Sequence, residues 1–309
     1  MTWSISANRT FRKCQRQWFY QKVFASWAAK KIPERRLAYV LSKLTTINGL
    51  RGTVVDDVLS EFLVSELNEN RIPERQVVEN KCLQRFDHRV ENARLHKIDE
   101  QCGVNTAIPN DFTILHETEY GDGINDEDVE QARAEIKQAV HNLYEFESLL
   151  SDLRDSSYVI SQRGLTYKIG NSSVKAFPDI VAFYNDQPPI VLDWKVHHFG
   201  NSDAARQLAS YAIALTKAPH RDFAIFMDGC TAPSIRLWEA QLLVAKLRVH
   251  QFNAEQYSDL EEYIASQSEV MTLAVSGRKK ACDFSPSEFS ATLEPQHCQR
   301  CPFKRLCWE

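Results

Sequence analysis

The sequence predicts an α/β protein in which helices flank a small mixed sheet. Apolar residues before Ser156 recur at helical spacing, whereas the chain after it contains several short strand-like runs divided by turn residues. The chain has 309 residues, of which 43% are hydrophobic and 25% charged. This ordinary globular composition excludes a disordered or fibrous protein, and the length suffices for a full core.

The first half of the chain is expected to be helical, which gives the protein an N-terminal helical region. Capping residues such as Ser6 and Asn125 precede stretches in which apolar residues return every three or four positions. Residues 68–126 have no clear period, so we expect a variable insertion of helices and loops there. The predicted helices cover residues 6–28, 47–67 and 126–153.

The second half is expected to hold the sheet, within a core at residues 157–250 of a single domain, 1–309. Turn residues such as Gly170 and Asn185 divide the strand-like runs. Ser202 or Asp203 can cap a helix that ends near residue 217, and a last helix is expected over 254–275. The predicted strands cover residues 158–169, 174–184, 189–196, 222–227 and 234–239.

Charge is unevenly distributed along a chain whose net charge is −4. Residues 1–40 contain nine Lys or Arg and one acid, whereas residues 111–155 contain 13 acids and three bases. An acidic chain does not suit indiscriminate coating of nucleic acid, but a basic N-terminal arm can contact phosphates locally. Without a long apolar run or the apolar core of a signal peptide, we expect no membrane contact and a cytoplasmic location.

Two neighbouring predicted strands place acidic residues side by side. Asp179 follows Pro178, and Asp193 and Lys195 share one face of the next strand because side chains alternate along a strand. Paired carboxylates among apolar residues repel each other and lose hydration, and a divalent cation relieves both costs. Carboxylate oxygens suit Mg²⁺ or Mn²⁺, which polarise a phosphodiester and acidify a bound water that Lys195 could position. The alternative is an exposed ion pair on an edge strand.

Gln207 and Tyr211 lie four residues apart on the helix that follows, so they share one helical face. An amide and a phenol placed there could orient a phosphate or a water on the metal. Ordinary helix packing explains the same spacing equally well.

In order and spacing, these residues resemble the PD-(D/E)XK nuclease superfamily and specifically its RecB-like branch. Pro178-Asp179 matches the PD, Asp193-Trp194-Lys195 matches the (D/E)XK, and Gln207 and Tyr211 match the Q-x-x-x-Y of the branch. The resemblance extends from about residue 3 to the C-terminus, except for residues 68–126. It implies a restriction-endonuclease-like core.

The resemblance also implies roles for the matching residues. Asp179, Asp193 and the backbone carbonyl of Trp194 would bind the metal, and Lys195 would be the catalytic lysine, with Gln207 and Tyr211 completing the catalytic set.

One position departs from the RecB-like pattern. The branch commonly carries a metal-ligating His in the frame G-x-x-x-H, and here Gly52 is followed by Asp56 at the His position. Aspartate can also bind Mg²⁺ or Mn²⁺, and its charge would favour a second cation. Asp57 is the expected bystander. The alternative is a solvated Asp-Asp pair on an amphipathic helix.

Three of the eight cysteines form a C-x₂-C-x₅-C cluster near the C-terminus, at Cys298, Cys301 and Cys307. Three thiolates need a fourth ligand to complete a tetrahedral zinc site or an iron–sulfur cluster. The candidates are Cys14, Cys282 and His297, of which His297 is the weakest because it is adjacent to Cys298.

The segment around Cys14 is similar to the opening of iron–sulfur RecB-like nucleases, both the AddB type and the small CRISPR-associated exonucleases. This similarity implies a four-iron (4Fe-4S) cluster that staples the N-terminus to the tail, residues 282–309. Zn²⁺ is the alternative. The implied ligands are Cys14, Cys298, Cys301 and Cys307.

Together these observations predict a metal-dependent DNA exonuclease for single-stranded or unwound ends, active in DNA repair, CRISPR adaptation or phage defence. The chain has no phosphate-loop motif, so a helicase or another subunit is the expected partner. One alternative is a catalytically weak or partner-activated nucleic-acid-binding subunit of a helicase–nuclease or defence complex, which the replacement of His by Asp56 supports. Another is a zinc-stapled endonuclease of the restriction type.

Overall fold

A computed structural model describes residues 2–29, 31–103, 108–197, 204–218, 220–278 and 280–308. It confirms the predicted α/β class, with two small mixed sheets and flanking helices, and the N-terminal helical region. The chain divides into two compact units. The first comprises Met1–Ile5, Arg51–Gln84 and Gln131–Val270, and the second comprises Ser6–Leu50, Arg85–Glu130 and Met271–Glu309.

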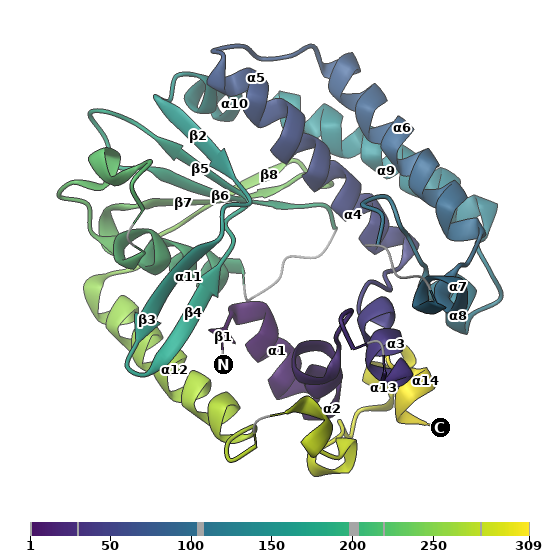
Figure 1. Ribbon diagram of the computed structural model, residues 1–309. Helices are drawn as coiled ribbons and strands as arrows, with labels where there is room; N and C mark the ends of the chain where they lie inside the picture. Colours follow the sequence, from purple (N-terminus) through teal and green to yellow (C-terminus); the bar gives the residue numbers. More distant parts are fainter. Residues whose placement is uncertain are drawn as a thin grey trace. The chain divides into compact units, whose positions relative to one another are not determined.

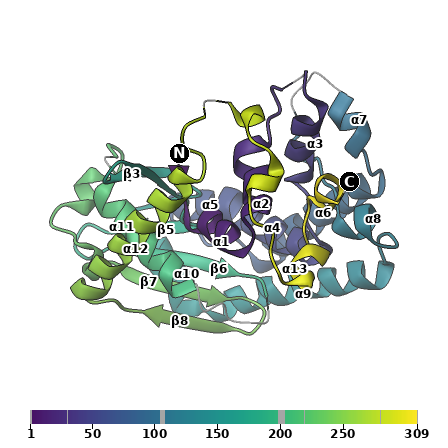
Figure 2. The same ribbon diagram turned by 90° about the horizontal axis from the view of Figure 1, so that it is seen from below.

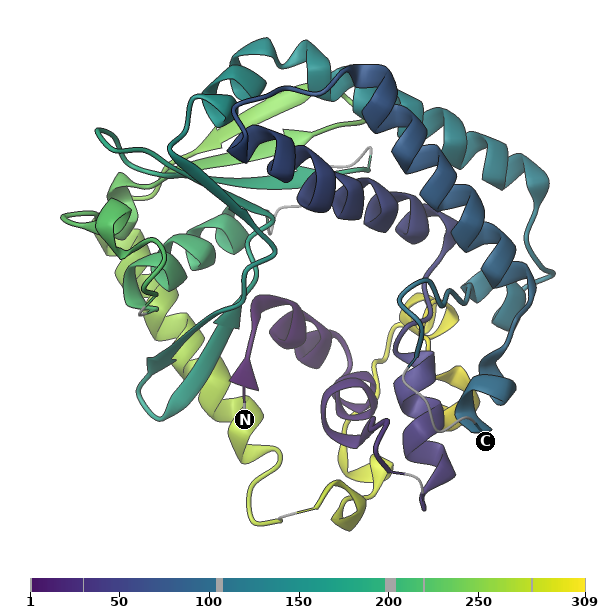
Figure 3. The ribbon, with the colours of Figure 1, turned by 45° about the horizontal axis from the view of Figure 1, so that its top comes forward.

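Within the described residues, the first unit contains both sheets. The five-stranded sheet has the order β2 (Tyr158–Ser161), β5 (Ile180–Phe183), β6 (Ile190–Lys195), β7 (Arg236–Gln241) and β8 (Lys246–His250). Its β6 and β7 are parallel, and the other neighbours are antiparallel. β5 is buried throughout, as is β6 up to Trp194, which explains why both are nearly continuous apolar runs. The three-stranded sheet has the order β1 (Thr2–Trp3), β4 (Ser172–Ala176) and β3 (Leu165–Ile169), with the β3–β4 hairpin visible in Figure 3.

The strands predicted over 158–169 and 174–184 are each divided in two, because residues 162–164 and 177–179 carry the chain from one sheet to the other. Gly164 and Pro178 are both poor residues for a strand interior. The two crossing segments lie side by side, since the main-chain N–H of Gln162 is 3.1 Å from the carbonyl oxygen of Pro178 and 3.3 Å from that of Asp179.

Helices cover the five-stranded sheet of the first unit. One continuous helical segment, as predicted for 47–67, consists of α4 (Ile47–Val58), the π-helix Leu59–Leu63 and α5 (Val64–Asn68). Its last helix, α5, packs against β2. α11 (Ala204–Lys217) packs against β6 and β7, and Figures 1 and 2 show it on the face of the sheet opposite α5. The three longest helices, α6 (Arg75–Arg94), α9 (Asp126–Glu145) and α12 (Ala254–Leu273), have 20 residues each, and α10 (Glu147–Arg154) has eight.

The prediction of a strand at 222–227 is wrong, because Ala224–Met227 form a 3₁₀ helix. Phe223 is buried and stacks on Phe183 with their ring centroids 5.0 Å apart, whereas Ile225 is 82% exposed. The segment thus buries one aromatic ring and does not pair with a strand. The capping positions 202 and 203 lie outside the described residues.

The second unit is helical in its described part, and its N-terminal helix is divided. α1 (Ile5–Lys13) ends at Cys14, whose extended backbone and thiol cap α2 (Gln15–Trp18), and the π-helix Phe19–Phe24 follows. The remaining helices include α3 (Pro33–Leu41), α7 (Ile98–Gly103), α8 (His116–Tyr120), α13 (Pro295–Gln299) and α14 (Lys304–Cys307).

Aromatic side chains hold the N- and C-terminal segments of the second unit together. Phe19 stacks on Phe289 with a centroid distance of 4.3 Å, and Tyr20 stacks on Phe303 at 5.6 Å. Across the described part of the whole chain, no helix combines the length and apolarity needed to cross a bilayer.

Candidate metal centre and cysteine cluster

Asp179 and Asp193 meet across two neighbouring strands of the first unit. Asp179 directly precedes β5, and its Oδ2 accepts a hydrogen bond from the main-chain N–H of Trp194 in β6 at 3.1 Å. Asp193 is fully buried. Burial raises the pKa of Asp179 well above its usual range, and the charges of Asp193 and Asp56 raise it further. The pKa of Asp193 is raised by burial against the opposing effect of Lys195.

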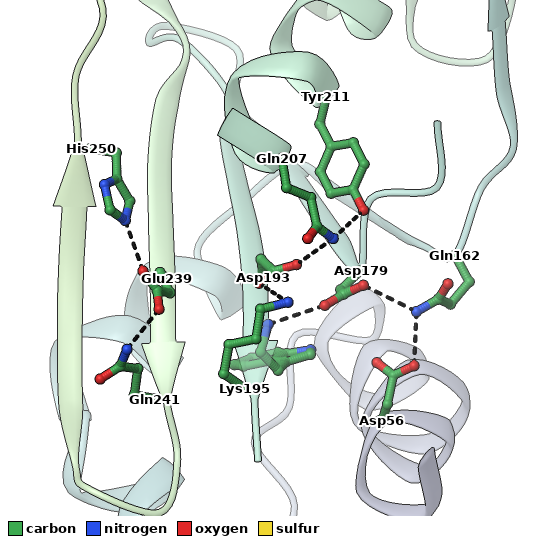
Figure 4. A network of polar contacts seen from close by, with 11 residues as sticks. Asp56, Gln162, Asp179, Asp193, Lys195, Gln207, Tyr211, Glu239, Gln241 and His250 are labelled. Atoms are coloured by element: carbon green, nitrogen blue, oxygen red, sulfur yellow. Dashed lines mark hydrogen bonds and ion pairs between the residues drawn. The ribbon is translucent and has the colours of Figure 1, made fainter. Parts of the chain in front are cut away.

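Lys195, Gln207 and Tyr211 gather around the Asp193 carboxylate (Figure 4). The ammonium of Lys195 forms an ion pair with Oδ2 of Asp193, and the Gln207 amide donates to Oδ1 at 3.1 Å. The same amide nitrogen donates to the Tyr211 hydroxyl at 2.6 Å. Burial raises the pKa of Tyr211, so the phenol keeps its proton at neutral pH.

Asp56 joins this group from α4. Its Oδ2 accepts a hydrogen bond from Nε2 of Gln162 at 2.9 Å, and the same amide lies 3.4 Å from Oδ1 of Asp179 (Figure 4). Oδ1 of Asp56 is buried and has no hydrogen-bond partner among the described residues. Burial raises the pKa of Asp56 to about 6, with a further contribution from Asp57.

The donor set fits a hard divalent cation. The charge of Asp193 raises the pKa of both Asp56 and Asp179, and that of Asp56 raises the pKa of Asp179, so the site holds more negative charge than the single ammonium of Lys195 offsets. Oxygen-rich groups of this kind suit Mg²⁺ or Mn²⁺. As they stand, the described His, Cys, Asp and Glu side chains include no group of three or more arranged to hold a metal ion. Donors from Gln162 and Lys195 instead occupy carboxylate oxygens.

Two residues at this site, Gln162 and Glu239, are not predicted from the sequence. Gln162 could be found only from the pairing of β2 with β5, which sets it opposite Asp179. Glu239 on β7 lies in register with Asp193 and is fully buried. Its Oε1 accepts from Nε2 of Gln241 at 2.7 Å, and its Oε2 lies 2.9 Å from Nε2 of His250 (Figure 4). In the sequence, Glu239 two residues before Gln241 is only a weak indication of a site residue. The parallel pairing of β6 with β7 is needed to place Glu239 beside Asp193.

The second unit brings four cysteines to one pocket. The lining includes His297, while Cys282 is exposed and lies outside it. Burial raises the pKa of the Cys301 thiol to about 11, and the other three thiols contribute in the same direction. Thiolates are the ligands that zinc and iron–sulfur clusters use in proteins. The four cysteines in the pocket are Cys14, Cys298, Cys301 and Cys307.

Hydrogen bonds fix the C-terminal segment that carries three of these cysteines. The Tyr20 hydroxyl donates to the carbonyl oxygen of Leu306 at 2.7 Å, and the Tyr120 hydroxyl donates to that of Pro302 at 2.9 Å. Arg16 donates through Nη1 to Sγ of Cys307 at 3.9 Å. The chain around the pocket is therefore held by contacts that need no metal.

The family model described as the PD-(D/E)XK nuclease superfamily matches residues 2–308. No curated protein matches the chain.

Proposed function

The chain belongs to the PD-(D/E)XK nuclease superfamily, a family of metal-dependent enzymes that hydrolyse phosphodiester bonds, and from this premise we propose that it is a DNA exonuclease. Its substrates would be single-stranded or unwound DNA ends. One observation carries the proposal. Three carboxylates from separate elements, Asp56, Asp179 and Asp193, converge beside Lys195.

In this proposal the three carboxylates and the backbone carbonyl of Trp194 hold Mg²⁺ or Mn²⁺. When bound, the cation polarises the phosphodiester and lowers the pKa of a water. Asp56 in place of an imidazole makes the ligand set richer in oxygen, which favours hard cations. The buried Oδ1 of Asp56, which has no hydrogen-bond partner in the described part of the chain, supports this assignment.

Lys195 would position the attacking water and stabilise charge that develops on the phosphate. Its ammonium is anchored by Asp193, which fixes it at the carboxylate group. Gln207 orients the other oxygen of Asp193, and Tyr211 in turn orients Gln207. Such supporting hydrogen bonds hold a ligand in one geometry.

A four-iron cluster in the cysteine pocket is also part of the proposal. It rests on the resemblance of the cysteine spacing to iron–sulfur RecB-like nucleases and on the four thiols that line one pocket. The cluster would supply a covalent staple between Cys14 and the C-terminal segment. Because the sequence has no phosphate-loop motif, unwound ends would come from a helicase partner in a repair or defence complex.

A cleavage assay tests the activity. End-labelled linear and closed circular DNA, each single- and double-stranded, is incubated with Mg²⁺ or Mn²⁺. The Lys195→Ala variant should lose at least about 100-fold in rate. Lys137→Ala, which removes an exposed lysine on α9 of the same unit, should cleave like the wild type.

The pattern of substrates separates the alternatives. Loss of linear DNA with sparing of circles supports an exonuclease, whereas cleavage of circles indicates an endonuclease. DNA binding without cleavage in either metal would contradict the proposal and favour a partner-activated subunit.

A further inference from the structure

Phe177 is an exposed aromatic side chain close to the candidate metal centre. It lies two residues before Asp179, in the segment where the chain crosses from one sheet to the other, and it is 43% exposed. Two residues of extended chain span roughly 6–7 Å, a distance that one nucleotide can bridge between its base and a phosphate. The Cα atom of Phe177 is therefore no farther from that of Asp179 than one nucleotide reaches.

A lysine accompanies the ring. The ammonium of Lys175 lies over Phe177, 4.7 Å from the ring centroid. Among the described residues no carboxylate forms an ion pair with Lys175, so its charge is available to an anion. The nearby Arg163 differs, because its Nη2 lies 2.8 Å from both Oδ2 of Asp222 and Nε2 of His220.

Gly164 makes room for this arrangement from the neighbouring crossing segment. A Cβ at this position would lie 3.1 Å from the ring edge of Phe177 and 3.4 Å from Cε of Lys175. The first of these contacts is tighter than ordinary van der Waals separation, so a side chain at residue 164 would shift the ring by a few tenths of an ångström. The glycine thus lets Phe177 and Lys175 lie against the crossing segment.

We propose that Phe177 and Lys175 form a nucleotide-binding subsite next to the metal centre. The base of an unpaired nucleotide would stack on Phe177, and a backbone phosphate would pair with Lys175. Stacking requires a base that is free of its own helix, so the subsite selects single-stranded nucleic acid. This inference rests on the proposed nuclease function and specifies the form of its substrate.

An abasic scan tests the base contact. Single-stranded oligonucleotides that lack one base at successive positions from the labelled end are titrated without divalent cation, so that binding is measured without cleavage. The wild type should lose roughly 5- to 100-fold in affinity at one position of the scan. Phe177→Ala should bind the intact strand more weakly by a similar factor and lose the sensitivity at that position.

Two further variants separate stacking from structural damage. Phe177→Trp keeps an aromatic face and should retain the position-dependent loss. Val249→Ala removes a 59% exposed apolar side chain from β8 in the same unit and should bind like the wild type.

The phosphate contact is tested by the salt dependence of binding. Loss of one phosphate contact reduces the slope of log affinity against log salt by about 0.7 for a single strand. Lys175→Ala should show this reduction, and Lys137→Ala should not.

Different results would refute the proposed subsite and the proposed nuclease activity. The subsite is refuted if no abasic position weakens binding of the wild type, or if Phe177→Ala keeps the same position-dependent loss of affinity. Either result refutes it even if cleavage is normal. Absence of metal-dependent cleavage refutes the proposed activity. Even then, a loss of affinity at one abasic position that disappears in Phe177→Ala would establish the stacking contact.

Discussion

The amide of Gln162 links Asp56 to the sheet across 106 residues of chain, with a hydrogen bond of 2.9 Å to the carboxylate. Gln162 has a positive φ of 48°, in the left-handed region that favours glycine. This conformation costs on the order of 1 kcal/mol for a residue with a Cβ. The contacts that Gln162 makes with Asp56 and Asp179 offset that cost and place a donor between two carboxylates.

Two substitutions of Gln162 separate its backbone from its side chain. Gln162→Ala and Gln162→Gly both remove the amide, but only glycine relieves the positive φ. We expect Gln162→Ala to lower the free energy of unfolding by about 1 kcal/mol more than Gln162→Gly does. Urea unfolding at neutral pH measures the difference. Equal stability of the two variants would contradict this expectation, because the strain relieved would then be no larger than the extra entropy that glycine gives the unfolded chain.

The raised pKa of Asp56 makes the stability of the metal-free protein depend on pH. Its pKa of about 6 exceeds the ordinary value of 3.8, so the folded state binds the proton more tightly than the unfolded state does. This contribution to the free energy of unfolding should therefore fall as pH rises from about 4 to 6 and then level off.

Asp56→Asn should remove that pH-dependent contribution. At pH 8 without metal, the variant should be more stable than the wild type by on the order of 1–2 kcal/mol, and the gap should close below about pH 4. Added Mg²⁺ should stabilise the wild type more than the variant, because the lost carboxylate is a proposed ligand. Thermal unfolding across pH with chelator and with Mg²⁺ measures both effects. A gap that persists at pH 4 would contradict the assigned pKa.

The sequence supported the parts of the site that depend on local spacing. Asp193 and Lys195 share a strand, and Gln207 and Tyr211 share a helical face, so periods of two and 3.6 residues predict their proximity. The α/β class followed from the same periods.

The remaining contacts depend on long-range pairing, which one sequence does not reveal. Gln162 reaches Asp179 only because β2 pairs with β5, and Glu239 reaches Asp193 only because β6 and β7 are parallel. The crossing between sheets at Pro178 and the 3₁₀ helix Ala224–Met227 likewise result from tertiary packing that overrides strand propensity.

Glu239 should tune the metal affinity of its neighbour on β6. Its charge raises the pKa of Asp193, so it adds negative potential at the candidate metal centre. Glu239→Gln removes the charge and should weaken the apparent Mg²⁺ affinity roughly 3- to 10-fold, with little change in kcat at saturating Mg²⁺. Glu239→Ala should also lower the free energy of unfolding by about 1–3 kcal/mol, because Gln241 and His250 lose a buried partner. The dependence of the cleavage rate on Mg²⁺ concentration measures the apparent Mg²⁺ affinity of each variant. An unchanged affinity in Glu239→Gln would refute the electrostatic role of Glu239.

Cys14 allows ligation to be tested separately from helix capping. Its sulfur accepts the main-chain N–H of Gln17 at 3.4 Å, and serine is itself a preferred N-cap, so Cys14→Ser should preserve the start of α2. The hydroxyl is a poor replacement for a thiolate in an iron–sulfur cluster.

Anaerobically purified wild type should therefore contain about four iron and four sulfide per chain and absorb broadly in the visible range. Cys14→Ser should lose most of the iron, yet remain folded, because Tyr20 and Tyr120 still hold the C-terminal segment. Cys282→Ser, which changes an exposed thiol outside the pocket, is the matched control and should keep its iron. Full iron in Cys14→Ser would exclude Cys14 as a ligand. A colourless protein that contains zinc and loses it on His297→Ala would instead assign the fourth position to the imidazole in the pocket lining.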